Sequence, residues 1–357
     1  AYRLTFAELA RVADNLAADF YAGGLRQDDI VVVQLPNIAE LAVLYLALGK
    51  LGVILSPVPV QYGPFELGKA SQVVEPSAYI TVANFKGKNF AQEHGPSLGP
   101  DCKVFCFGDD TPDGAVALSL SSESRPADAE YRAYLDGFEA SPNDIFTICW
   151  TSGTTGQPKG VPRSHNMWMA SAIGSHDAAL LQDGDTLLNP FPIVNMASIG
   201  GFLYCWLMRA ATLVLHHPFD MQVFLKQIED EKVTYTIAPP AALTMLLKKR
   251  EILDSVDISS LRSIGSGSAP LSEFMVAGFG LSGNPEALIA GVVDTGVRHL
   301  TLIANNAGAM GLNLATWLQA GIVDRFIGTY VGGNADLQAA IDGGRVDVQL
   351  LPQGTFV

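Results

Sequence analysis

Short runs rich in β-branched residues alternate with amphipathic helical segments along the sequence, and this alternation limits the fold more than any other feature. The run "DIVVVQLP" predicts a strand over residues 29–36, "NIAELAVLYLALGKLG" a helix over 37–52, and "VILSPVPV" a second strand over 53–60. Further strands are predicted at "AYITV" and "KVFCF", over 78–82 and 103–107. Such alternation is typical of parallel sheets with helices on both faces, so the expected fold class is α/β.

A polar stretch over residues 108–143 interrupts the alternation. Its segments "DDTPDGA" and "SSESRPADAE" are rich in Asp, Ser, Pro and Gly, and we interpret the stretch as a surface excursion without chemistry of its own. The pattern resumes with a strand over 144–150, a loop, and a helix over 165–181. Later strands are predicted at "TLLNPF", "ATLVLHH" and "TYTIAPP", and later helices at "MQVFLKQIEDEKV" and "AALTMLLKKR".

Length and composition agree with a globular α/β protein. The chain has 357 residues, of which 48% are hydrophobic and 16% are charged, which fits two or three buried cores and excludes a disordered or fibrous class. The net charge of −14 argues against nucleic acid as a partner.

Cysteine use and apolar stretches bear on the cellular compartment. The sequence has no CxxC pair and no histidine at metal-ligand spacing from a cysteine, so no metal site is predicted. We interpret the four cysteines as reduced core residues of a cytoplasmic protein; they are Cys102, Cys106, Cys149 and Cys205. The longest apolar stretches are interrupted by Lys50 and Arg209 before they could span a bilayer. The N-terminal segment carries charges throughout, which predicts a helix and not a signal peptide.

The loop "TSGTTGQPKG", over residues 151–160, carries the strongest functional signal. Its glycines let the backbone turn sharply and point successive N–H groups at one anion, while its hydroxyls add donors. Lys159 adds a compact positive charge that would bind phosphate and not transfer protons, so a polyphosphate is the natural ligand. The P-loop pattern GxxxxGK[ST] does not fit, because Pro158 precedes the lysine and Gly160 follows it. The alternative is a surface turn without a ligand. The predicted nucleotide-binding residues are Thr151, Ser152, Gly153, Thr154, Thr155, Gly156 and Lys159.

The segment "WTSGTTGQPKGV", followed by Ser164 and His165, resembles the signature of the adenylate-forming acid–CoA ligases, or AMP-forming acyl-CoA synthetases. The resemblance extends over about residues 1–272. It implies that the loop holds the β- and γ-phosphates of ATP while a carboxylate attacks the α-phosphate, and that the thiol of CoA then displaces AMP. The cofactors implied are ATP, Mg²⁺ and CoA.

Three weaker segments are similar to further parts of the ligase family. "NPFPIVNMASIGG" resembles the acyl-pocket loop, but Asn195 stands where a histidine or an aromatic residue is usual, which leaves the acid specificity open. "IAPPAALTMLL", with Pro239 and Pro240, resembles the strand and helix behind the acyl pocket. "GSGSAPLS" resembles the loop that passes the adenine and the acyl group, through Gly267, Ser268, Ala269 and Pro270.

The composition changes near Phe274, where a second resemblance begins. No lysine follows Lys249, and 14 of the 35 glycines lie in the last eighty or so residues. The segment "FMVAGFGLSGNPEALIAGVVDTGVRHLTLIANNAG", and the residues from there to 357, resemble the α subunit of the 3-oxoacid CoA-transferases. A glycine turn that opens a helix can seat a pyrophosphate, and CoA carries one, although a tight turn without a ligand is the alternative. The predicted CoA-binding residues are Gly280, Gly283, Asn284 and Pro285.

The two resemblances are each partial over this sequence. The ligase motifs that supply a magnesium-binding glutamate, a ribose-binding aspartate and a C-terminal lysine are not found. Ala277 stands where the transferase pattern has the first of two glycines, and the transferase glutamate nucleophile belongs to a β part without a counterpart here.

We therefore expect two parts, a truncated adenylate-forming domain over residues 1–272 and a fragment similar to the CoA-transferase α subunit over 273–357. Three functions remain open: an acid–CoA ligase, a CoA-transferase component that needs a β partner, and a non-catalytic fusion or assembly join. The resemblance to the ligases covers most of the chain, so we favour descent from a ligase. For the activity of this chain, we favour the third hypothesis, a join that completes no reaction. The expected partners are a carboxylic acid and CoA, with a transferase β subunit or self-association as further alternatives.

Overall fold

A computed structural model groups the chain into two compact units. The first comprises residues 1–236 and 258–263, and the second comprises residues 237–257 and 264–357. The residues that the structure describes are 3–125, 128–151, 158–238, 243, 245–246, 250–253, 255–265, 286–294, 296–304, 307–308, 314–328, 330–332 and 334–351.

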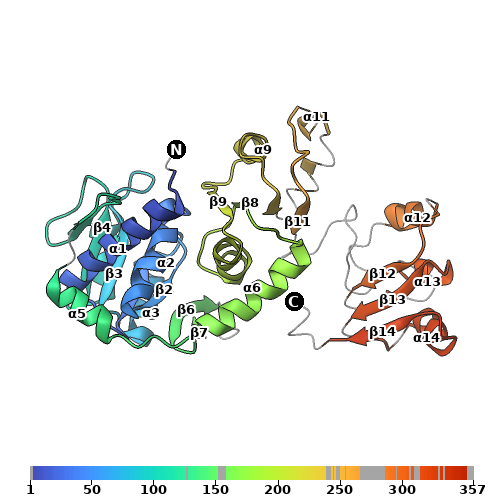
Figure 1. The fold of residues 1–357 in the computed structure, drawn as a ribbon, viewed down its shortest axis with the longest axis horizontal. Coiled ribbons are helices and arrows are strands. Elements are labelled where there is room, and N and C mark those ends of the chain that lie inside the picture. Colours follow the sequence, from blue (N-terminus) through green and yellow to red (C-terminus); the bar gives the residue numbers. More distant parts are fainter. Residues whose placement is uncertain are drawn as a thin grey trace. The chain divides into compact units, whose positions relative to one another are not determined.

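The larger sheet of the first unit has seven strands in the order β5-β4-β3-β1-β2-β6-β7 (Figure 1). All neighbouring pairs are parallel except β6 and β7, which are antiparallel. The central strands β1, β2 and β3 are almost entirely buried, which is typical of parallel sheets. The strands are β1 (Ile30–Val33), β2 (Ile54–Pro57), β3 (Ala78–Val82), β4 (Lys103–Phe107), β5 (Val116–Leu118), β6 (Ile145–Thr151) and β7 (Lys159–Ser164).

The helices of this region begin and end at recognisable capping residues. In α1, the Thr5 hydroxyl accepts the Glu8 N–H at 3.2 Å, and the Glu8 carboxylate accepts the Thr5 N–H at 2.8 Å, which forms a capping box. Helix α2 ends at Gly52, whose φ of +70° favours glycine. Helix α1 packs along α2 (Figure 1). The helices and one 3₁₀ turn are α1 (Phe6–Ala22), α2 (Ala39–Leu51), α3 (Pro64–Val74), α4 (Phe90–His94), η1 (Gly95–Leu98) and α5 (Ala129–Gly137).

The polar stretch over residues 108–143 is more ordered than its sequence predicts. It contributes strand β5 at the edge of the sheet and helix α5, which begins at the Asp128 side chain. The sequence pattern missed both because β5 has three residues with one buried, and because Tyr131 is the one buried residue of α5. Elements this short and exposed carry almost no hydrophobic period.

A second sheet has four strands in the order β11-β10-β8-β9. Strand β8 is parallel to both β9 and β10. The strands are β8 (Thr186–Asn189), β9 (Thr212–Leu215), β10 (Tyr235–Ile237) and β11 (Ser263–Gly265). The helices are α6 (His165–Ala179), α7 (Met196–Ser198), the π-helix η2 (Ile199–Tyr204), α8 (Cys205–Met208), α9 (Met221–Asp230) and α11 (Arg250–Leu253).

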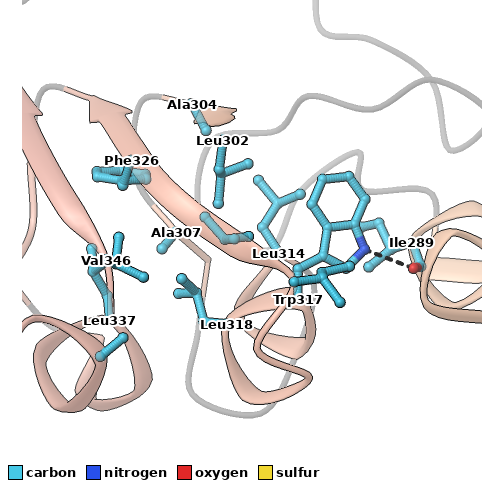
Figure 2. Packing of buried hydrophobic residues seen from close by; sticks show 13 residues of the cluster. Ile289, Leu302, Ala304, Ala307, Leu314, Trp317, Leu318, Phe326, Leu337 and Val346 are labelled. Carbon is cyan, nitrogen blue, oxygen red and sulfur yellow. Dashed lines mark hydrogen bonds between the residues drawn. The ribbon is translucent and has the colours of Figure 1, made fainter. Parts of the chain in front are cut away.

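The second unit contains a three-stranded parallel sheet in the order β12-β13-β14. Its described helices share one core with Leu302 and Phe326, in which the Trp317 indole donates to the carbonyl of Ile289 at 2.7 Å (Figure 2). On β12, Ile303 points away from this core and is 63% exposed. The elements are α12 (Glu286–Asp294), β12 (Leu300–Ile303), α13 (Ala315–Gln319), β13 (Val323–Gly328), α14 (Ala335–Asp342) and β14 (Asp347–Leu350).

Other sequence predictions have mixed outcomes. The predicted helix over 241–250 lies largely outside the described residues, and so does the boundary after residue 272, which stays a prediction. All four cysteines are unpaired, and burial raises the pKa of Cys102 to about 11 and that of Cys205 to about 12. Within the described residues, no helix combines the length and apolar character needed to cross a bilayer.

Candidate functional site

The predicted phosphate loop is carried by the β6–β7 hairpin. Thr151 ends β6 and Lys159 begins β7, and the two residues pair directly across the hairpin. The predicted residues between them, Ser152, Gly153, Thr154, Thr155 and Gly156, lie outside the described residues. The hairpin thus brings a hydroxyl and an ammonium group to the two ends of one short loop.

Close packing beneath the loop explains why a glycine follows the lysine. Gly160 pairs with Trp150, and a Cβ added at Gly160 would lie 2.8 Å from Ile148 Cγ2, which is closer than real Cβ atoms approach. The Trp150 indole donates a hydrogen bond of 2.8 Å to the hydroxyl of Ser56, which lies on β2. The strand pair is therefore anchored to the sheet directly below the predicted loop.

The end of β7 passes straight into helix α6. The Ser164 hydroxyl caps this helix by accepting the N–H of Met167. His165 stacks on Phe146 with 4.1 Å between ring centroids, and its Nδ1 lies 2.8 Å from the hydroxyl of Tyr204. Burial lowers the pKa of His165, with a smaller opposing contribution from Asp144. This hydrogen bond connects the start of α6, directly after the hairpin, to the last residue of η2.

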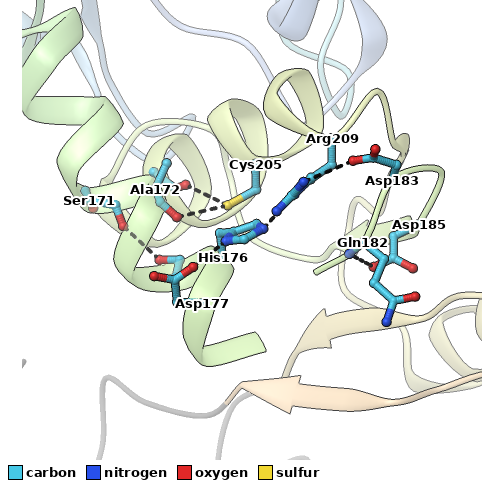
Figure 3. A network of polar contacts seen from close by, with 11 residues as sticks. Ser171, Ala172, His176, Asp177, Gln182, Asp183, Asp185, Cys205 and Arg209 are labelled. Atoms are coloured by element: carbon cyan, nitrogen blue, oxygen red, sulfur yellow. Dashed lines mark hydrogen bonds and ion pairs between the residues drawn. The ribbon is translucent and has the colours of Figure 1, made fainter. Parts of the chain in front are cut away.

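The opposite end of α6 is tied to α8 by a polar network (Figure 3). Arg209 Nε donates to His176 Nε2 at 2.6 Å, and Arg209 Nη1 pairs with Asp183 at 3.1 Å. Because His176 Nε2 is an acceptor, its Nδ1 carries the hydrogen that is donated to Asp177 at 2.7 Å. Helix α6 is therefore held at both ends, which fixes the exit of the hairpin.

The predicted acyl-pocket loop follows strand β8. Asn195 is exposed and caps α7 by accepting the N–H of Ser198 at 3.2 Å. The carbonyl of Ile193 accepts a hydrogen bond of 2.6 Å from the hydroxyl of Tyr45. Burial keeps the pKa of Tyr45 well above its ordinary value, so this hydroxyl remains a donor. The loop is thus anchored at one point to α2.

The remaining predicted site residues are not described by the structure. They are Pro239, Pro240, Gly267, Ser268, Ala269, Pro270, Gly280, Gly283, Asn284 and Pro285. Their roles stay predictions. No cluster of three or more His, Cys, Asp or Glu side chains suited to a metal is present among the described residues, so the carboxylate that would bind Mg²⁺ is not assigned.

A buried polar network that the sequence did not reveal lies at the carboxyl end of β1, where the strand order reverses. Gln34 Oε1 accepts from the Tyr79 hydroxyl at 2.6 Å and from His94 Nδ1 at 2.9 Å. Gln34 Nε2 donates to the carbonyls of Pro59 and Tyr62. Such a reversal commonly binds ligands in open α/β sheets. In this protein the hydrogen-bonded side chain of Gln34 occupies the reversal point.

Comparison with known proteins identifies the family. Residues 1–280 match the model of the AMP-binding enzyme family. The chain belongs to the AMP-binding enzyme family. Residues 272–357 of this AMP-binding enzyme match the Coenzyme A transferase family. The two resemblances predicted from the sequence, and the order in which they are joined, are therefore confirmed.

Curated relatives of this AMP-binding enzyme include plant ligases. The 4-coumarate–CoA ligase 1 of Solanum tuberosum is 29% identical over 276 residues, which cover 75% of this chain and 48% of the relative. The 4-coumarate–CoA ligase 1 of Arabidopsis thaliana is 25% identical over 277 residues, with the same two coverages of 75% and 48%. The chain spans about half the length of the curated relatives it matches.

Solved structures show the same fold. The apo structure of MbtA from Mycobacterium smegmatis superposes with a TM-score of 0.64 at 25% identity, over 76% of this chain and 48% of that chain. Acetoacetyl-CoA synthetase from Streptomyces lividans gives a TM-score of 0.60 at 23% identity, over 76% of this chain and 43% of that chain. The predicted fold class, an α/β protein with the parallel-sheet subdomains of an adenylate-forming enzyme, is confirmed.

Proposed function

We propose that the first part of the chain binds ATP through residues 151–160 and a carboxylic acid beside Asn195, as an AMP-forming acid–CoA ligase. In this reaction a carboxylate oxygen attacks the α-phosphorus of ATP, and pyrophosphate leaves. The thiol sulfur of CoA then attacks the acyl carbon of the acyl adenylate, and AMP leaves. Membership of the AMP-binding enzyme family supports the reaction class.

The observation that carries this proposal is the pairing of Thr151 with Lys159 across the hairpin. An ammonium group and a hydroxyl at the two ends of a glycine-rich loop suit the terminal phosphates of ATP, because successive backbone N–H groups and a positive charge then converge on one anion. Lys159 is exposed and can reach a ligand beyond the hairpin end. Its proposed role is charge stabilisation during adenylation.

Calorimetric titration of ATP tests the assignment of the loop. We expect Lys159→Ala to weaken ATP binding by about 1–3 kcal/mol, the usual cost of losing a partner to a charged group. The control is Lys88→Ala, which removes the same charge from an exposed site on another loop and should leave the affinity unchanged. Equal ATP affinity in both variants and the wild type would remove the loop from the site.

We further propose that these 357 residues alone bind ATP without completing the ligase reaction. Residues 272–357 match the transferase family where the ligase match stops, near residue 280. The ligase motif that supplies a magnesium-binding glutamate is not found in the sequence, and loss of one such electrostatic contact costs on the order of 10²–10³ in rate. We expect no acid-dependent exchange of labelled pyrophosphate into ATP with short, medium or aromatic acids. Robust exchange that Lys159→Ala abolishes would overturn this proposal.

The match to the Coenzyme A transferase family favours a second candidate function for the second part, which is CoA binding with a β partner supplying the nucleophile. Calorimetric titration of CoA into the chain tests this directly, with Gly283→Val as the variant expected to lose binding.

A third candidate is a join without a biological role. Trypsin would release residues 263–298 as one peptide, because no Lys or Arg lies between Arg262 and Arg298. Detection of that peptide in cells would show that the joined chain is made.

A further inference from the structure

One buried asparagine connects the two sheets of the first unit. Asn37 follows β1, and its Nδ2 donates to the carbonyl of Asn189 at 3.0 Å and to that of His216 at 3.3 Å. Asn189 is the last residue of β8, and His216 directly follows β9. A single amide group therefore holds the carboxyl ends of two strands of one sheet against the end of β1 in the other.

The connection continues from Asn189 into the acyl-pocket loop. Asn189 Oδ1 accepts the N–H of Phe191 at 3.0 Å. The Ser198 hydroxyl lies 3.3 Å from the same oxygen and 3.1 Å from the carbonyl of Phe191. Ser198 in turn donates its N–H to Asn195 Oδ1. Asn37 thus binds the main-chain carbonyl of Asn189, and the Asn189 side chain and Ser198 continue the connection to Asn195.

This relay is retained although burial penalises it. Asn37 is 2% exposed, and Asn189 and Ser198 are fully buried. Asn37 Oδ1 and Asn189 Nδ2 are two of the four buried side-chain polar atoms that have no hydrogen-bond partner among the described residues. Unpaired buried polar atoms are unfavourable, so these two asparagines are not optimal for stability.

We propose that Asn37 is a positioning residue that sets the shape of the acyl-pocket loop over residues 190–198, and thereby the affinity for the carboxylic acid. This inference rests on the proposed function. Asn37 itself lies behind the loop and acts through Asn189 and Ser198. Loss of its amide leaves the carbonyls of Asn189 and His216 without this donor. The ends of β8 and β9 then lose this connection to the segment after β1, although the His216 N–H still donates to the Asn189 carbonyl at 3.1 Å.

The chain offers a matched control. Asn15 is also buried, at 8% exposure, and its Nδ2 likewise donates to two carbonyls, those of Ser121 at 2.7 Å and Glu123 at 2.9 Å. Asn37→Leu and Asn15→Leu therefore remove the same amide group and the same number of hydrogen bonds, from two positions that are both buried. Only the first variant cuts the relay to Asn195.

Two measurements on the full chain test the proposal. In Asn37→Leu, we expect amide hydrogen exchange at Phe191 and Ser198 to accelerate at least tenfold, with no such change in Asn15→Leu. Calorimetric titration of short, medium and aromatic acids in the presence of ATP should show an affinity about tenfold weaker, or a changed order of preference, in Asn37→Leu only. ATP affinity should stay within twofold in both variants. If Asn37→Leu does not fold, Ser198→Ala breaks the relay at an isosteric site and should accelerate exchange at Phe191.

The possible outcomes distinguish a failure of the positioning role from a failure of the proposed function. Equal exchange, or an equal loss of acid affinity, in the Asn37 and Asn15 variants overturns the positioning role and leaves the proposed function intact. A wild-type chain that binds ATP but no acid of the panel overturns the acyl-pocket assignment, and the positioning role with it.

Discussion

Arg262 and Asp185 form an ion pair of 2.6 Å across 77 residues of sequence, and Asp185 is only 4% exposed. The carboxylate also accepts the N–H of Gln182 at 2.7 Å. Burial raises the pKa of Asp185, but the hydrogen bonds from Arg262 and Gln182 outweigh it, and the net pKa lies below the ordinary value. The pair therefore joins the segment before β11 to the start of β8.

The first prediction concerns this pair. Arg262→Gln should lower the free energy of unfolding by about 1–3 kcal/mol, because it leaves a buried carboxylate without its charged partner. Arg125→Gln breaks a pair with Asp19 whose side chains are 44% and 37% exposed, and it should cost less than about 1 kcal/mol. Urea unfolding at pH 7 measures both. Equal losses would show that the burial of Asp185 does not strengthen its pair.

The second prediction uses two glycines with opposite surroundings. Gly160→Ala should destabilise the chain by about 1–3 kcal/mol, because its Cβ would meet Ile148 at 2.8 Å. Gly174→Ala, at an exposed position of helix α6 with nothing within 4 Å of the added carbon, should stabilise by about 0.5–1 kcal/mol. Thermal melting of the two variants gives the signs. A more stable Gly160→Ala protein would contradict the hairpin packing.

The third prediction concerns acid sensitivity. Burial lowers the pKa of His165, so the unfolded chain binds this proton more readily than the folded one. The stabilisation is complete above the unfolded pKa, near 6.5, and is lost as the pH falls toward the lower folded pKa. His165→Gln should reduce the slope of unfolding free energy between pH 7 and 5, by up to about 1.4 kcal/mol per pH unit. Tyr204→Phe keeps the titrating imidazole and should keep most of the slope. Identical slopes in wild type and His165→Gln would refute this assignment.

The fourth prediction concerns self-association. Strand β12 is an outer strand of the described three-stranded sheet, and it exposes 63% of Ile303. Outer strands with exposed apolar side chains favour pairing with other chains. We expect concentration-dependent oligomers in sedimentation velocity, which Ile303→Lys should reduce. Phe65→Lys, at a 69% exposed position in the first turn of helix α3, serves as the control. A monodisperse monomer at all concentrations would exclude the association.

Buried, locally consistent segments were predictable from the sequence, whereas elements imposed by distant partners were not. The Val-rich run of β1 and the run of β4 are recognisable as strands, because each residue's preference agrees with its burial. Strand β7 reads "KGVPRS", with Pro162 inside it, and it is a strand only because β6 pairs with it at the edge of the sheet. The sequence pattern predicted a loop followed directly by a helix here, and it missed this antiparallel strand.

The candidate site likewise has one part that was predictable from the sequence and another that was not. The chemistry of residues 151–160 is local, so glycines, hydroxyls and a lysine in one short segment were enough to predict a phosphate ligand. The relay from Asn37 to Asn195 joins residues far apart in the sequence, since its first hydrogen bond alone spans 152 positions, and neither asparagine is unusual in its own segment. The hydrogen bonds of Gln34 are equally non-local. Only the folded chain brings such groups together.

Trp150 gives the hairpin an optical property of its own. Its indole lies one residue before the predicted loop and donates a hydrogen bond to Ser56, which fixes its orientation. The other three tryptophans are buried residues of α6, α8 and α13. We therefore expect intrinsic fluorescence to offer a label-free signal for a ligand that binds at the hairpin.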